Sequence, residues 1–147
     1  MSKDSFRIST GAKRVEVNDD GECITLNLSD QSFLPRLAAV IGGFNAKLPE
    51  YEAHAKELDA LTAETEQDNF KKLSEISRYN EKIHRDLMTE IDGVFQDEVC
   101  RKVFGDIVPA MDMFTEFFDQ LSPYVEKFGR ERAAKVSKYS PNRTGNI

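Results

Sequence analysis

The chain has no tryptophan and only two cysteines. Cys23 and Cys100 are far apart in the sequence and do not have the spacing of a zinc site. We therefore expect no disulfide framework and two reduced, partly buried thiols, as in a reducing cytosol. With 39% hydrophobic residues in 147, the chain has enough apolar content for one core of ordinary size.

Long hydrophobic runs are also absent. The longest, residues 37–41, has five residues, whereas a membrane-spanning helix needs about twenty. Residues 2–5 are polar, so the start of the chain lacks the apolar region of a signal peptide. These two absences predict a cytoplasmic protein with no membrane partner.

The net charge of −6 is unevenly distributed along the chain. Residues 50–98 carry fourteen acidic and six basic side chains, and this acidic middle would repel nucleic acid. Residues 129–147 carry one acidic side chain and five basic ones. The basic residues are Arg130, Arg132, Lys135, Lys138 and Arg143. Five charges make a small footprint for nucleic acid, so an acidic protein surface suits this segment equally well.

The spacing of hydrophobic residues changes near residue 29. Before it, apolar residues alternate with polar ones, and after it they recur every three or four residues. The sequence Asn-Asp-Asp-Gly at 18–21 is typical of a tight turn, because Gly21 can adopt a positive φ. This pattern predicts an antiparallel hairpin with one apolar face. The expected strands lie near 13–18 and 22–28, with a third short strand near 6–8.

The rest of the apolar pattern predicts helices, so the fold class is α+β and mostly helical. A first helix should begin between Ser29 and Ser32, weaken at 42–43 and end before Pro49, where a second helix opens. The helical spacing of apolar residues is interrupted across residues 62–69. The chain from 50 to 95 is therefore either one long helix or an antiparallel pair, and the usual length of globular helices favours a break.

The last helix carries the strongest aromatic stripe of the chain. We expect Asp106 to cap it, Pro123 to kink or divide it, and Gly129 to end it. The chain is then a single domain over 1–147. It divides into a hairpin at 1–30, a helical body at 31–128 and a basic, partly disordered tail at 129–147.

Few residue patterns point to catalysis. Glu81 and His84 have the Glu-x-x-His spacing of di-iron bundles, but the other histidine, His54, follows Tyr51 rather than a glutamate by three residues. We therefore interpret His84 as an exposed histidine on a solvated face. The sequence contains no Gly-rich phosphate loop, no Gly-x-Ser-x-Gly and no Cys-x-x-Cys. We expect neither an enzyme nor a cofactor.

The aromatic stripe has two interpretations. Its members recur at helical spacing, which is most simply a core face: Met111, Phe114, Phe117, Phe118, Leu121, Val125 and Phe128. Adjacent residues cannot point the same way on a helix, so Phe117 and Phe118 should face different neighbours. One of them could then belong to a docking surface for another chain.

Six short segments form a combination that points to a known group of proteins: residues 6–13, 15–18, 28–33, 91–95, 103–106 and 134–139. Together they resemble proteins encoded in the tail modules of siphoviruses and prophages of Gram-positive bacteria. Proteins with this pattern are similar to tail assembly chaperones. Residues 97–101 are more polar than that pattern.

The resemblance implies a non-enzymatic adaptor in the bacterial host cytoplasm. Its partners would be the tape measure protein and tail tube subunits. Self-association of the chain is a further possibility that the sequence leaves open. We expect the contacts to come from exposed apolar side chains of the first and last helices and from the basic tail. The expected partner-binding residues are Phe33, Leu37, Phe117, Phe118, Lys135 and Lys138.

Three other functions remain open at this point. The chain could be a structural tail or head-completion protein that stays in the virion. It could be a small phage regulator that binds nucleic acid through residues 130–143, although the acidic middle argues against this. It could also be a metalloenzyme built on Glu81 and His84.

Overall fold

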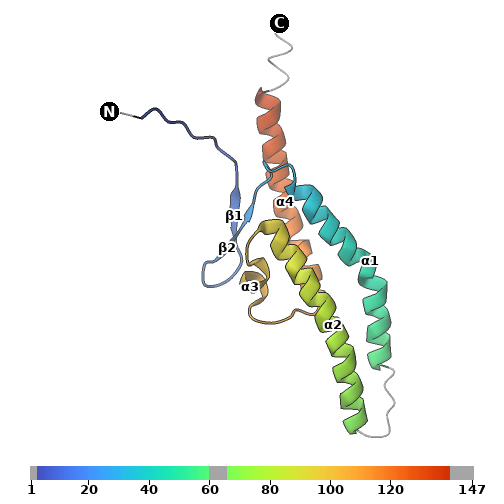
Figure 1. Ribbon diagram of the computed structural model, residues 1–147. Coiled ribbons are helices and arrows are strands. Elements are labelled where there is room, and N and C mark those ends of the chain that lie inside the picture. Colours follow the sequence, from blue (N-terminus) through green and yellow to red (C-terminus); the bar gives the residue numbers. More distant parts are fainter. Residues whose placement is uncertain (1–2, 60–65, 140–147) are drawn as a thin grey trace.

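The computed structural model describes residues 3–59 and 66–139 (Figure 1). Its elements are β1 (Lys13–Glu16), β2 (Cys23–Leu26), α1 (Phe33–Asp59), α2 (Glu66–Phe95), α3 (Val99–Phe104) and α4 (Met111–Tyr139). The protein is therefore α+β and mostly helical, with an N-terminal antiparallel hairpin, as the hydrophobic rhythm predicts. The third strand expected at residues 6–8 is not formed. Residues 3–12, here named the N-terminal arm, have no regular structure.

The hairpin forms where the alternating pattern predicts it. Val15 lies opposite Ile24, and these inward side chains join the core. The turn is held by Asn18, whose Oδ1 accepts a hydrogen bond from the Glu22 backbone N–H at 3.1 Å. Gly21 has φ of 79°, a conformation that costs glycine nothing. The turn is therefore encoded locally.

Local chemistry also sets the start of α1. Asp30 Oδ1 accepts from the backbone N–H of Ser32 at 2.9 Å and from its hydroxyl at 2.6 Å. The Phe33 N–H donates to the Asp30 carbonyl at 3.0 Å, which begins the helix directly after the expected region.

The expected end of the first helix is wrong. α1 continues through Gly42, Gly43 and Pro49 to Asp59, so no second helix opens at Pro49. Glycine and proline cost a helix interior about 1 and about 3 kcal/mol respectively. Beyond the glycines, α1 buries Phe44 and Tyr51 in the core. This tertiary burial outweighs the local preference for a break.

Of the two alternatives for residues 50–95, the structure has the antiparallel pair. Residues 66–69 already belong to α2, and residues 62–65 lie outside the described residues. α1 ends at Asp59 and α2 begins at Glu66, and the two run side by side in opposite directions (Figure 1). The Tyr79 hydroxyl donates a hydrogen bond to Glu50 across the pair. In Figure 1, the lower part of this helix pair extends past α3 and the start of α4.

The final helix differs from expectation at both ends. It begins at Met111 rather than after Asp106, and Pro123 does not divide it. It also continues past Gly129 to Tyr139, so the exit expected at Gly129 is wrong. Much of the basic segment is therefore helical, and residues 140–147 lie outside the described chain.

The core is organised around Phe114, which is fully buried on α4. Its ring lies 6.2 Å from that of Phe44 on α1 and 5.4 Å from that of Phe104 on α3. The His84 ring on α2 lies 5.4 Å away on another side. One phenylalanine thus contacts a side chain from each of the other three helices.

Candidate functional site

The four apolar residues expected to bind a partner are core residues. Their side chains are 3% (Phe33 and Leu37), 7% (Phe117) and 9% (Phe118) exposed. The expectation that they are exposed is therefore wrong. Phe118 lies against Phe44 of α1 at 5.4 Å between ring centroids, and Phe117 lies against Phe104 of α3 at 5.8 Å. The adjacent phenylalanines do face different neighbours, but both neighbours belong to the same chain.

Of the two basic residues expected to bind a partner, Lys135 lies far from Phe117 and Phe118. Lys135 is exposed on α4, eighteen residues beyond Phe117, or about 27 Å along a helix. The side chain of Lys138 lies outside the described part of the structure. On this stretch of α4, Glu131 approaches Lys13 of β1 at 3.8 Å. The structure therefore does not bring Lys135 together with Phe117 and Phe118.

His84 is buried rather than exposed, which corrects the interpretation from sequence. Only 6% of its surface is accessible, and its Nδ1 lies 2.7 Å from the Pro109 carbonyl oxygen. A carbonyl can only accept, so Nδ1 carries the hydrogen. Burial lowers the pKa of His84 below its ordinary value. His84 is therefore a neutral residue of the core.

The Glu81 and His84 pair does not converge on a metal. Glu81 instead pairs with Arg85 one turn along α2, at 3.0 Å. Among residues 3–59 and 66–139 there is no group of three or more histidine, cysteine or carboxylate side chains that could hold an ion. The Nε2 atom of His84 and the hydroxyl of the neighbouring Tyr51 are both buried without a hydrogen-bond partner in the described structure.

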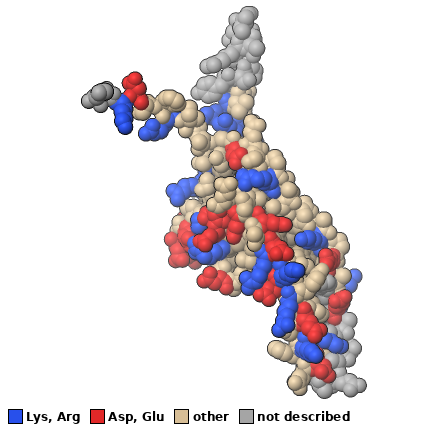
Figure 2. Space-filling model, in the orientation of Figure 1, with Lys and Arg blue, Asp and Glu red and all other residues tan. Residues whose placement is uncertain are grey.

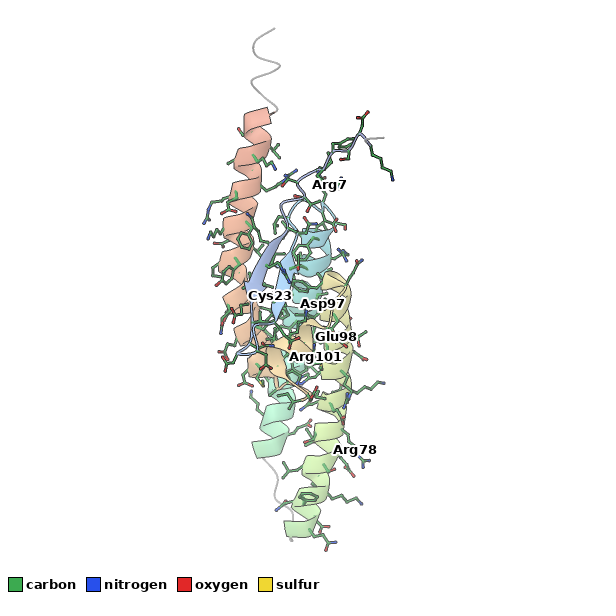
Figure 3. All side chains as sticks on the ribbon, turned by 90° about the vertical axis from the view of Figure 1, so that its left-hand side faces the viewer. Arg7, Cys23, Arg78, Asp97, Glu98 and Arg101 are labelled. Atoms are coloured by element: carbon green, nitrogen blue, oxygen red, sulfur yellow. The ribbon has the colours of Figure 1, made fainter. Side chains whose placement is uncertain are left out.

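A polar junction joins the hairpin turn to α3, and sequence reasoning missed it. Arg101 donates to Glu22 at 3.0 Å and to Glu98 at 3.2 Å, and Lys102 Nζ lies 2.7 Å from Asp97. Figure 3 shows Asp97, Glu98 and Arg101 gathered beside the strands, and Figure 2 shows charges of both signs concentrated there. The polar segment 97–101 thus serves a structural contact.

This junction shifts the acidity of its members. The hydrogen bond from Arg101 lowers the pKa of Glu22, and that from Lys102 lowers the pKa of Asp97. Asn18 adds an uncharged link, because its Nδ2 donates to the Lys102 carbonyl at 3.0 Å. The junction therefore favours ionised carboxylates that hold the turn in place.

A groove runs between β1 and α4 and is here named the β1–α4 groove. Its volume is about 390 Å³, and its walls come from β1, β2, α3 and α4. Apolar side chains form most of the lining, with carboxylates of Glu16 and Glu116 among them. The lining residues used below are Val15, Glu16, Glu116, Gln120, Leu121 and Tyr124. This chemistry suits an apolar peptide segment flanked by positive charge.

Exposed apolar side chains also lie on the N-terminal arm and at the start of α2. On the N-terminal arm, Phe6 is 82% and Ile8 is 75% exposed. At the start of α2, Phe70 is 74% and Leu73 is 42% exposed. None of these four was singled out as a binding residue from sequence. The i, i+2 spacing on the arm and the i, i+3 spacing on the helix were the available signals.

The described helices have no segment long and apolar enough to cross a membrane. Comparison of the chain with curated proteins and with solved structures gave no match. Comparison with protein families gave a match over residues 20–146, which cover β2 and all four helices. The chain therefore belongs to a family of unknown function, DUF6673.

Proposed function

We propose that the chain is a non-enzymatic binding protein that acts as a phage tail assembly chaperone. The observation that carries the proposal is the exposure of Phe70 and Leu73 on the part of α2 that extends beyond the body (Figure 1). The resemblance to tail assembly chaperones supplies the partner, a tape measure protein. Tail tube subunits would be recruited to the same complex.

The chemistry of this end of α2 suits a helical partner. Phe70 and Leu73 are three residues apart and so lie on the same side of the helix. An amphipathic helix of the partner could cover them by packing its apolar face against this side of α2. A tape measure protein is long, helical and prone to aggregate, so many acidic chains bound along it would shield its apolar stripe and add net negative charge.

The test is copurification with a tape measure fragment in a bacterial host. We expect the wild-type chain to retain the fragment and Phe70→Ser/Leu73→Ser to lose at least about tenfold in affinity, which is about 1.4 kcal/mol. A matched control is Ile107→Ser/Val136→Ser, because these side chains are also exposed, at 49% and 50%. Equal binding by both double variants would rule out this end of α2 as the interface.

Particle composition separates the chaperone from the nearest alternative. A chaperone acts during assembly, so mass spectrometry of purified particles should find the tape measure protein but not this chain. A stoichiometric amount of the chain in finished particles would instead identify a structural tail protein. Enzymatic turnover forms no part of either function.

A further inference from the structure

The N-terminal arm has the residue pattern of a strand but no strand to pair with. Phe6 and Ile8 are two residues apart and would lie on one side of an extended chain, with Arg7 on the other. Both apolar side chains are largely exposed, at 82% and 75%. In Figure 1 the arm leads away from the body.

The sheet offers one open edge. β2 is covered on its outer side by α3, where Lys102 Nζ donates to the Cys23 carbonyl at 3.1 Å. β1 pairs with β2 on one side, and on its other side it borders the β1–α4 groove. An added strand at this edge would find backbone groups to pair with and an apolar wall made by Leu121 and Tyr124 of α4.

The arm and the groove are complementary in charge as well as in polarity. The arm carries Lys3, Asp4 and Arg7, a net charge of +1, whereas the groove carries the carboxylates of Glu16 and Glu116. With Phe6 and Ile8 turned into the groove, Arg7 would stand on the outer face of the sheet. Glu16 belongs to the exposed part of β1. An incoming arm would thus satisfy apolar and charged groups together.

The arm of the same chain is poorly placed for this edge. At Gly11, the position of a Cβ atom would lie 3.2 Å from the Ser29 hydroxyl oxygen, so the backbone there lies beside Ser29, three residues beyond the end of β2. From there the arm leads away from the body (Figure 1). To reach its own groove it would have to reverse direction within residues 9–12.

We propose that the arm of one copy adds as a third strand to the free edge of β1 in a second copy, with Phe6 and Ile8 in the β1–α4 groove. This is strand addition between identical chains. It does not depend on the tape measure partner or on the exposed end of α2.

The first test is light scattering of the full chain across a concentration series. The wild-type mass should rise from 16.7 kDa to at least twice that value, whereas Phe6→Ser/Ile8→Ser should stay near 16.7 kDa. Phe70→Ser is the matched control, because Phe70 is similarly exposed at 74%, and it should associate like the wild type. A wild-type chain that stays monomeric, or an arm variant that associates normally, would overturn the proposal.

Cross-linking then distinguishes exchange between copies from an arm folded onto its own chain. A chain with Phe6→Cys and Cys23→Ser is mixed with a chain carrying Gln120→Cys and Cys23→Ser, and the mixture is oxidised. We expect a disulfide-linked heterodimer, because Gln120 lines the groove. Replacing Gln120→Cys with Phe70→Cys should abolish it. Equal cross-linking of both mixtures, or none in either, would refute the placement of the arm.

Discussion

Replacing Phe114 with alanine should remove a large part of the stability of the fold. Phe114 is fully buried, and its ring contacts those of Phe44, Phe104 and His84 at 5.4 to 6.2 Å between centroids. Phenylalanine-to-alanine changes in cores cost about 3–5 kcal/mol, and aromatic pairs add about 0.5–1.5 kcal/mol each beyond their area. With three ring neighbours, we expect a loss of about 4–5 kcal/mol, in the upper half of that range.

Such a loss is readily measured by urea unfolding followed by circular dichroism. Small domains have total stabilities of about 5–15 kcal/mol and urea slopes near 2 kcal/mol per molar. Phe114→Ala should therefore lower the unfolding midpoint by about 2 M. Phe70→Ala is the control, because Phe70 is 74% exposed and its replacement should change stability by less than about 0.5 kcal/mol. A shift below about 0.5 M for Phe114→Ala, or equal shifts for both variants, would refute the assignment of the α4 aromatic stripe to the core.

Three further predictions follow from single contacts. Burial holds the pKa of His84 below the 6.5 expected when unfolded, so the unfolded chain binds more protons near that pH. Wild-type stability should then be constant above about pH 7.5 and fall towards pH 5.5, and urea titrations of His84→Gln should lack that slope. Cys23 is half-buried, whereas Cys100 is fully buried and burial raises the pKa of its thiol. A thiol reagent should therefore label Cys23 in the native protein and reach Cys100 only on unfolding. Labelling of both cysteines at equal rates would contradict the burial of Cys100 in the core. Arg101→Ala should lower the unfolding midpoint, because it removes the ion pair with Glu22. The difference in midpoint from the wild type should shrink in about 1 M NaCl, which screens the charges. A difference that does not depend on salt would show that the pair does not act by charge.

The hairpin could be predicted from sequence because its determinants are local. Alternation of apolar residues and the turn residues Asn18 and Gly21 are sufficient for its position. The arm has the same alternation at Phe6 and Ile8, yet it forms no strand in a single chain. Alternation indicates which residues can pair but not whether an edge is within reach.

The helix boundaries were less predictable because burial decides them. Pro49 looked like a boundary and lies inside α1, where the apolar face on both sides of it packs into one core. Gly129 likewise lies inside α4. Propensity is a weak prior, and contacts between distant segments override it.

The candidate site was mislocated because sequence cannot tell how many sides of a helix are covered. α4 is covered by α1 on the side of Phe118 and by α3 on the side of Phe117, so two adjacent phenylalanines are both buried. For His84 a signal existed: Leu87 and Ile91 follow at i+3 and i+7, which places the histidine on the apolar face of α2. Its neighbours in sequence, which are mostly charged, obscured that pattern.

The composition of β1 has a consequence for the state of the protein in a crowded cell. Three of its four residues, Lys13, Arg14 and Glu16, are charged and exposed. An unpaired strand with bare apolar faces would invite indiscriminate fibril growth, and charged side chains are the usual safeguard against it. These charged side chains thus protect the strand against aggregation, while its backbone stays available to a short segment such as the arm.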